Sequence, residues 1–322
     1  MTVHAADPPA PLVWPLVSSS KTEIRTFNGH TNTVTDIVGR IGTPPSLIIF
    51  TEGNHLMVLL GEDIVGAFPT WAKSQPRYAD LELGNIVVVT LPQAVVVEMV
   101  RSRGIAMGNL RIDVSRTSGF YPDIVMGGSE PLRELRKLRI IEPQARLFSK
   151  NRGLALLVRK GNPLGIRDLA GVSRVGARLA QPDRVEFGGR ARNRGVIEGL
   201  IGKAAADAFF AREVEHFPGR LGITHRDVPE MIARDYADVG LSQYHLISHW
   251  VRTFPDRFEL VPIEGTERFP LSIAFARVID PLRPHALEAF EEFFFGRARD
   301  IYPKYDFARM DDDRYGATLE LE

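Results

Sequence analysis

Residues 176–195, GARLAQPDRVEFGGRARNRG, constrain the fold more than any other stretch of the chain. The stretch begins as a short apolar segment, turns at Gln181-Pro182-Asp183, passes a Gly-Gly pair and enters a helical run that carries Arg190. A strand that ends in a glycine-containing loop before a helix exposes backbone N–H groups at the helix start. Those groups and the helix dipole favour an anion. The stretch therefore predicts a strand–loop–helix unit with an anion-binding loop.

The first half of the chain repeats this alternation. Residues 56–60 and 86–89 are short apolar runs typical of buried strands, and residues 123–126 are a third. Each run is followed by a loop of small, hydroxyl-bearing or acidic residues and then by helical spacing of apolar residues. Alternating strands and helices indicate an α/β fold with mainly parallel sheets, in which ligands bind beyond the carboxyl ends of the strands.

The second half continues the pattern with strands at 154–158, 172–179 and 237–241, and with helices at 190–201, 204–214 and 228–236. Residues 258–262 and 270–275 are expected to be strands as well. Apolar residues at helical spacing between 287 and 294 predict an amphipathic helix packed on a core. The acidic tail from Asp311 is expected to be loose.

Composition excludes several classes of function. The chain has 322 residues, enough for one large or two ordinary domains, and its net charge of +0 provides no field for nucleic acid or an acidic membrane. It contains no cysteine, which excludes disulfides, thiolate metal sites and a cysteine nucleophile. No stretch reaches the roughly 20 apolar residues of a membrane span.

The N-terminal residues 1–45 are rich in turn formers and are expected to be a weakly structured extension. No Lys or Arg precedes Lys21, and prolines interrupt the apolar part, so the pattern of a secretory signal is missing. The sequence as written therefore indicates a cytoplasmic protein, or a periplasmic one whose signal has been removed.

Three segments carry a resemblance to a known family: LVRKGNPLGIRDLAG (157–171), QPDRVEFGGRAR (181–192) and ADVGLSQYHL (237–246). With them the chain resembles the type II solute-binding proteins of ABC transporters, and most of all the molybdate and tungstate receptors. The resemblance spans roughly residues 55 to 305. It implies two α/β lobes joined by two crossover strands, the first from residues 46–158 and 260–322 and the second from residues 159–259.

The resemblance implies a receptor that closes its two lobes around a small anion. A molybdate- or tungstate-like oxyanion is the first choice, and a small organic carboxylate or phosphonate is the second. Neutral donors and helix starts hold a dehydrated oxyanion best. The predicted ligand-binding residues follow the strands or lie in the central loop, and they are Glu62, Asp63, Thr90, Gly128, Ser129, Asp183, Arg190, Ser242 and Tyr244.

Some of these residues have a competing interpretation. Ser129, Thr90 and Ser242 are also natural helix caps, and Asp183 is also a turn former after Pro182. Arg190 offers a fork for an anion, but an ion pair within the protein explains it equally well. Glu62 and Asp63 would repel an anion at the end of the predicted first strand, unlike the small or hydroxyl residues usual in molybdate receptors.

Two alternatives remain open from the sequence: a cofactor-free cytoplasmic lyase or dehydratase that uses Glu62 or Asp63 as a base, and a ligand sensor that acts on a partner protein. No catalytic triad, metal site or cofactor motif is predicted, and His245 and His249 lack the Glu of a metalloprotease motif. The expected partners are the small anion and an ABC transporter permease, with no nucleic acid, and the protein is expected to be a monomer.

Overall fold

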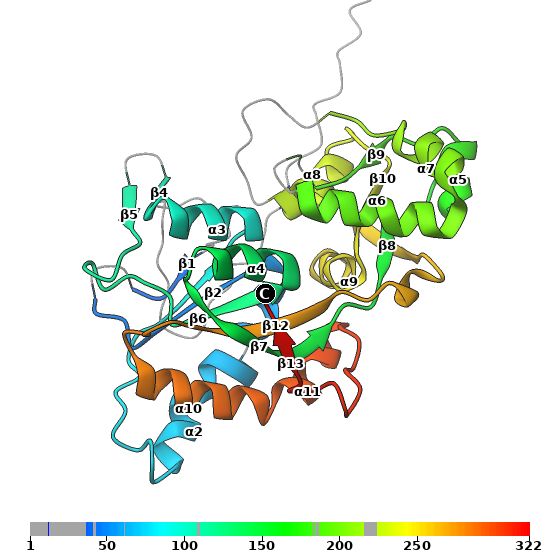
Figure 1. The fold of residues 1–322 in the computed structure, drawn as a ribbon. Helices are drawn as coiled ribbons and strands as arrows, with labels where there is room; N and C mark the ends of the chain where they lie inside the picture. The colour runs from blue at the N-terminus through cyan, green and yellow to red at the C-terminus, as the bar shows by residue number, and fades with distance from the viewer. Residues whose placement is uncertain are drawn as a thin grey trace, which may run out of the picture. The chain divides into compact units, whose positions relative to one another are not determined.

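The computed structural model describes residues 12, 37–40, 43–60, 62–107, 110–182, 184, 187–215 and 224–322. Within this part the chain forms two compact units, each with its own sheet and core (Figure 1). The four-stranded unit holds Arg152–Pro270, and the seven-stranded unit holds the described residues from 37 to 151 together with Leu271–Glu322. The seven-stranded unit is therefore discontinuous in sequence, because the four-stranded unit is inserted into it.

The sheet of the seven-stranded unit has the strand order β1-β3-β2-β6-β12-β7-β13. Only β3, β2 and β6 run parallel to one another, and every other neighbouring pair is antiparallel. A separate hairpin pairs β4 (Gly104–Met107) with β5 (Leu110–Asp113). The strands of the main sheet are β1 (Ile37–Val38), β2 (Leu47–Thr51), β3 (Ile86–Thr90), β6 (Ile124–Gly128), β7 (Ile141–Lys150), β12 (Ser272–Val278) and β13 (Thr318–Glu320).

Helices cover both faces of this sheet. Helices α3 (Gln93–Arg101) and α4 (Ser129–Lys137) pack on one face, and α2 (Phe68–Ser74) and α10 (Pro284–Phe295) lie on the other (Figure 1). Apolar residues at helical spacing on α3 and α4 pack against strands rich in Ile and Val. Helices α2 and α10 also bury apolar residues. The shorter elements are η1 (Gly53–His55), α1 (Leu56–Leu59), η2 (Glu62–Gly66), α11 (Ala298–Ile301) and η5 (Tyr302–Tyr305).

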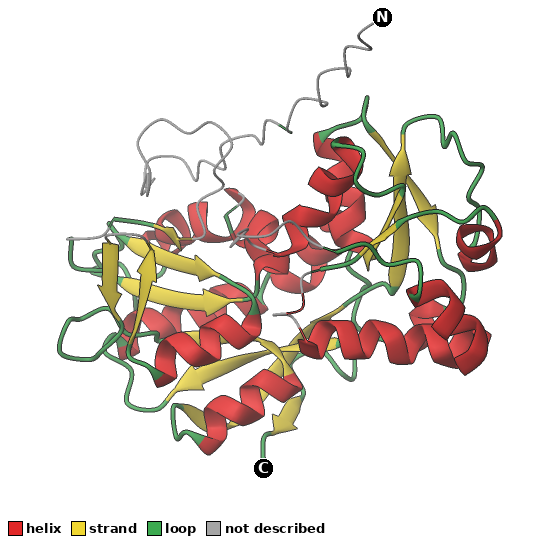
Figure 2. Cartoon of the chain, turned by 90° about the horizontal axis from the view of Figure 1, so that it is seen from above, coloured by secondary structure: helices red, strands yellow, loops and turns green. Residues whose placement is uncertain are grey.

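The four-stranded unit has the strand order β11-β8-β10-β9, and only β10 and β9 run parallel. Its strands are β8 (Leu154–Arg159), β9 (Leu179–Ala180), β10 (Val239–Gln243) and β11 (Phe258–Pro262). Helices flank this sheet too (Figure 2): α5 (Leu169–Arg174), α6 (Phe187–Ile201), α7 (Lys203–Phe210), α8 (Thr224–Ala233) and α9 (Tyr244–Thr253). The short η4 (Thr266–Arg268) precedes the return to the seven-stranded unit.

The predicted α/β class is confirmed, with three corrections. The sheets are mixed rather than mainly parallel, since antiparallel strands from the later part of the chain join the parallel ones. Residues 56–60, predicted as the first strand, instead contain α1, and the first strand of the parallel set is β2. Leu and Met are good helix formers, whereas the Ile-Ile-Phe run in β2 favours a strand. Most of residues 172–179 is helix or turn, with β9 only at its end.

The structure describes the C-terminal tail but only a small part of the N-terminal residues. Most of the predicted N-terminal extension, residues 1–45, lies outside the described residues. The acidic tail is ordered: β13 pairs with β7, and Leu321 is buried. Its backbone hydrogen bond to Pro143 fixes it to the sheet, so the expectation of a loose tail was wrong.

A buried ion pair joins the sheet to helix α10. The side chain of Asp123, which is 0% exposed, accepts hydrogen bonds from the backbone N–H of Ile48 at 2.9 Å and of Arg283 at 3.1 Å. The guanidinium of Arg283 donates a further bond of 3.0 Å to it. Burial raises the pKa of Asp123, while the charge of Arg283 and the hydrogen bonds oppose that rise. The pair thus fixes β2, β6 and the start of α10 at one end of the sheet.

We expect Arg283→Met to lower the free energy of unfolding by about 3 to 5 kcal/mol, because it leaves a buried carboxylate without its counter-charge. The double variant Asp123→Asn/Arg283→Met should recover much of this loss. Without Arg283 the pKa of Asp123 rises further, so the deficit should shrink as the pH falls toward the ordinary carboxyl pKa of about 4. Urea unfolding of both variants at several pH values measures the loss of stability, its recovery in the double variant and its dependence on pH.

The matched control for this experiment is Arg101→Met, which breaks an exposed ion pair with Glu98 on α3. Exposed pairs contribute about 0 to 1 kcal/mol, so this variant should be nearly neutral. Equal losses from Arg283→Met and Arg101→Met would contradict a structural role for the buried pair.

Candidate functional site

Two threonines and a methionine stand in register where the three parallel strands of the seven-stranded unit end. Thr51 of β2 pairs with Thr90 of β3 on one side and with Met126 of β6 on the other. Both threonines are 0% exposed. Because these strands are parallel, their carboxyl ends meet at one edge, which is where open α/β sheets place a ligand. This edge is the candidate site of the unit.

Two helices begin at this edge, and neither start is capped by a side chain. Helix α3 follows β3 with Pro92 at its N-cap, and α4 follows β6 with Gly128 at its N-cap. The first N–H groups of a helix have no partner within the helix, and they carry the positive end of its dipole. The first N–H groups of α3 and α4 therefore contribute a positive potential at this edge of the sheet.

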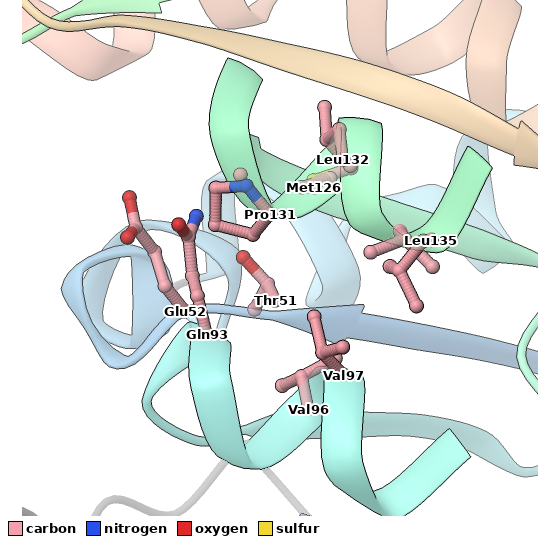
Figure 3. A pocket seen from close by; sticks show the side chains of 11 residues that line it. Thr51, Glu52, Gln93, Val96, Val97, Met126, Pro131, Leu132 and Leu135 are labelled. Atoms are coloured by element: carbon pink, nitrogen blue, oxygen red, sulfur yellow. The ribbon is translucent and has the colours of Figure 1, made fainter. Parts of the chain in front are cut away.

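A small pocket that is partly open to solvent lies between β2, α3 and α4. Its polar lining comes from Thr51, Glu52 and Gln93, whose polar ends lie near one another beside Pro131 at the start of α4 (Figure 3). The remaining lining residues are Val96, Val97, Val125, Met126, Gly127, Pro131, Leu132 and Leu135. Among the described residues that line this pocket there is no Lys or Arg.

The pocket contains two buried donors with no hydrogen-bond partner in the described part of the chain, Thr51 Oγ1 and Gln93 Nε2. The side chain of Gln93 lies directly against Gly127, where a Cβ would stand 2.2 Å from Nε2. A larger residue at position 127 would displace the amide of Gln93 from this place. An unsatisfied buried donor is unfavourable by about 1 to 3 kcal/mol, so a pair of them at a strand edge indicates a site that is completed by a ligand.

Glu52 brings a carboxylate to the same pocket. It is 8% exposed, and its Oε1 lies 3.2 Å from Nε2 of the fully buried His55. The imidazole is stacked on Phe307 at 5.5 Å, with Tyr302 and Phe148 against it. The pocket wall therefore contains a carboxyl group beside the two buried donors.

The four-stranded unit has an edge of the same kind, where the parallel strands β9 and β10 end. Gln181 follows β9 and is buried, and its Nε2 donates to Glu213 at 2.9 Å. Gln243 ends β10, and its Oε1 is buried without a hydrogen-bond partner among the described residues. The same is true of Asn193 Oδ1 on α6. This edge therefore presents amide groups.

The structure puts several of the predicted site residues at these two edges. Thr90 ends β3, and Gly128 ends β6 as the N-cap of α4. Ser129 is the first residue of α4 and not its cap, and Ser242 lies within β10, where Gln243 is the N-cap of α9. Tyr244 begins α9, and the guanidinium of Arg152 lies 4.8 Å from the centre of its ring. The expectation that Ser129 and Ser242 cap helices was therefore wrong.

The remaining predicted site residues are Glu62, Asp63, Asp183 and Arg190. Glu62 and Asp63 belong to η2 rather than to the end of a strand. Asp183 lies outside the described residues. Arg190 donates to both carboxylate oxygens of Glu213, at 2.7 and 2.8 Å, and to the carbonyl of Pro182. Its guanidinium is thus ion-paired within the protein, and a role as ligand clamp stays a prediction that requires Glu213 to release it.

Gln93 was not predicted as a site residue, although the strand before it was predicted correctly. Thr51 and Glu52 were missed because residues 56–60 were interpreted as the first strand. The run Leu47–Thr51, followed by a Glu-Gly turn, carries the signal that would have found them. It combines β-branched and aromatic residues with a hydroxyl at its carboxyl end.

No group of three or more His, Asp or Glu residues in the described part of the chain is arranged to hold a metal ion. Burial, with Arg252 and Arg226 adding to it, lowers the pKa of His249 to about 4, so this histidine is neutral at pH 7. In the same part of the chain, no helix combines the length and apolar character that crossing a membrane requires.

Comparison with known proteins now identifies the family. A model of the family described as bacterial extracellular solute-binding protein matches residues 91–307. The chain belongs to this family, whose members are substrate receptors of transporters. No curated protein matches the chain in sequence.

Solved structures with the same fold include three receptors. The sulfate-binding protein SubI from Mycobacterium tuberculosis H37Rv has a TM-score of 0.57 and 14% identity over 83% of this chain and 87% of that one. PEB3 with L-phospholactate, a protein from Campylobacter jejuni, has a TM-score of 0.54 and 16% identity over 82% of this chain and 100% of that one. A substrate-binding domain assigned to a molybdenum ABC transporter from Clostridium difficile has a TM-score of 0.50 and 11% identity, over 82% and 99%. The fold is that of the two-lobed periplasmic binding proteins.

We expect Thr51→Val to leave the ligand-free protein as stable as the unchanged chain or about 1 kcal/mol more stable, because it removes an unsatisfied buried hydroxyl. Thr266→Val is the matched control. Thr266 is also buried, but its hydroxyl bonds Leu154 N at 3.0 Å and Ile263 O at 2.8 Å, so its loss should be destabilising by about 1 to 3 kcal/mol. Chemical unfolding of both variants without ligand tests the contrast. A clear destabilisation by Thr51→Val would mean that its hydroxyl has a partner in the folded protein.

Proposed function

We propose that this protein is the receptor of an ABC transporter for a small anionic solute, held at the carboxyl edge of β2, β3 and β6. One observation carries the proposal: the unpartnered donors Thr51 Oγ1 and Gln93 Nε2 share a pocket with two uncapped helix starts. Neutral donors and helix dipoles stabilise an anion without the rotational freedom of a long cationic side chain.

Two ligand classes follow. A molybdate- or tungstate-like oxyanion comes first, supported by the sequence resemblance and by the likeness in fold to receptors named for sulfate and molybdenum. A small organic carboxylate or phosphonate comes second, supported by the likeness to PEB3, whose structure contains L-phospholactate. Both classes present several acceptor oxygens to the two donors.

The remaining parts of the proposal follow from the family. We propose that the receptor is a monomer that delivers its ligand to a transporter permease. Because the family is described as extracellular, we propose that the protein acts outside the cytoplasmic membrane. Closure of the two lobes around the ligand stays a prediction, which small-angle scattering with and without ligand tests through a decrease in the radius of gyration.

One argument for the alternative function, a cofactor-free lyase or dehydratase, no longer holds. It relied on Glu62 and Asp63 as acids at the end of a strand, and these residues lie in η2 instead. No observation in the described part of the chain favours catalysis over binding.

We expect a thermal-shift screen with molybdate, tungstate, sulfate, phosphate and small carboxylates or phosphonates to find a stabilising anion. Ligand at about 100 times its Kd adds about 2.7 kcal/mol, which raises Tm by about 5 to 10 °C in a chain of this size. Thr51→Val should weaken the binding of that anion about 10- to 100-fold, because a hydrogen bond to a charged group is lost. Thr266→Val should leave the affinity unchanged. Absence of any stabilising anion, or an unchanged affinity in Thr51→Val, would refute the proposed site.

A further inference from the structure

Four exposed arginines form a cluster at one end of the seven-stranded unit. This arginine cluster consists of Arg103 between α3 and β4, Arg111 in β5, Arg116 after β5, and Arg139 after α4. Within the described part of the chain, none of the four lies at ion-pair distance from an Asp or Glu side chain. The net charge of the whole chain is +0, so the cluster reflects an uneven distribution of charge and not a general excess.

Three of these arginines lie around the hairpin of β4 and β5. The backbone N–H of Val114 donates to the carbonyl of Arg103 at 3.1 Å, which joins the start of β4 to the end of β5. The guanidinium of Arg111 lies close to the backbone at the start of β4. The guanidinium of Arg116 lies 4.8 Å from the centre of the Tyr121 ring. Burial raises the pKa of Tyr121, and the nearby charges of Arg116 and Arg103 oppose that rise. The three arginines therefore lie near one another.

The fourth arginine, Arg139, joins this group from the end of α4. The N–H of Ile279, directly after β12, donates to the carbonyl of Ile140 at 2.9 Å, and the guanidinium of Arg116 donates to the carbonyl of the same Ile279. The last residue of β12 donates to the carbonyl of Asp123 at 3.1 Å, at the amino end of β6. The arginine cluster therefore lies at the amino end of β6, whereas the pocket lies at its carboxyl end.

Helix ends explain only half of the arginine cluster. The C-terminal end of a helix carries the negative end of its dipole and favours a nearby cation, which accounts for Arg103 after α3 and Arg139 after α4. Arg111 and Arg116 follow no helix. Neighbouring cations without acidic partners repel one another, and an anionic partner relieves that repulsion. The cluster thus has the charge of a surface that receives an anionic partner.

The hairpin indicates which kind of anionic partner fits. Strands β4 and β5 form a two-stranded sheet of their own beside the end of α3 (Figure 1). Residues 104–110, which lie between Arg103 and Arg111 in the chain, have the sequence GIAMGNL and contain no charge. A bilayer surface presents anionic headgroups next to an apolar boundary, which suits basic residues that flank an apolar segment. Nucleic acid presents phosphates without such an apolar layer, so it matches the arginines alone.

We propose that the arginine cluster and the β4–β5 hairpin form a docking surface for an anionic phospholipid membrane. Because the arginine cluster and the pocket lie at opposite ends of β6, docking keeps the edge that carries Thr51 and Gln93 away from the lipid. The inference goes beyond the proposed function, since it concerns a different surface and holds whichever anion the receptor binds.

The test is sedimentation of the full chain with vesicles of phosphatidylcholine, alone or mixed with phosphatidylglycerol, at low and at high salt. Binding should require phosphatidylglycerol and should be lost at high salt, because salt screens exposed charges. Each arginine near an anionic membrane strengthens binding about 5-fold, so Arg103→Gln/Arg111→Gln should weaken it about 25-fold. The matched control is Arg167→Gln/Arg174→Gln, which removes two exposed arginines from the four-stranded unit. It should bind the vesicles about as tightly as the unchanged chain.

A second measurement locates the part of the protein that contacts the membrane. The chain contains no cysteine, so one environment-sensitive dye can be attached to a single introduced cysteine. Thr117→Cys puts the dye next to Arg116 in the arginine cluster, and Glu130→Cys puts it in the first turn of α4 at the pocket edge. Both residues are exposed. Vesicles that contain phosphatidylglycerol should shift the emission of the dye at position 117 to the blue and leave that at position 130 unchanged.

Four outcomes would overturn the inference. They are no binding to phosphatidylglycerol vesicles at low salt, equal binding to vesicles of phosphatidylcholine alone, unchanged binding of Arg103→Gln/Arg111→Gln, and a blue shift at position 130 instead of 117. Binding of duplex DNA without binding of the vesicles would also overturn it and would assign the arginine cluster to nucleic acid. These outcomes leave the proposed anion site untouched, because the thermal-shift screen tests that site separately.

Discussion

The geometry of the seven-stranded unit depends on one buried carboxylate. Asp123 accepts hydrogen bonds from β2 and from the start of α10, and Arg283 neutralises it. It lies at the amino end of β6, the opposite end from the pocket. Because strand register is carried along the whole strand, fixing the strands at this end delivers Thr51, Thr90 and Met126 side by side at the other. The distant ion pair thus helps to place Thr51 at the candidate site.

The pocket shows how stability and function oppose each other in this unit. Thr51 and Gln93 bury donors that have no hydrogen-bond partner in the part of the chain that the structure describes. Each of these groups is unfavourable in the empty pocket. In the proposed function, a ligand with matching acceptor oxygens recovers this free energy, so the same groups that weaken the fold favour binding.

Local signals in the sequence were enough to predict β3, β6, β8 and β10, because each is an apolar run followed by a turn and a helical pattern. They also led correctly to the edges where Thr90 and Gly128 lie. They failed for residues 56–60, where a run of Leu and Met satisfies a buried strand and a buried helix alike. They did not identify Glu213 as the partner of Arg190 or join the tail to β7, because these contacts connect residues far apart in the chain.

The position of β12 has a consequence for how the chain is made. This strand lies between β6 and β7, yet it follows the entire four-stranded unit in the sequence. During synthesis from the N-terminus, the four-stranded unit has all of its strands before β12 leaves the ribosome. Until then β6 and β7 have no neighbour on their facing edges, and an unpaired strand edge is a template for pairing with other chains. Newly made chains therefore pass through a stage in which the four-stranded unit has all of its strands while the seven-stranded sheet still lacks β12 and β13.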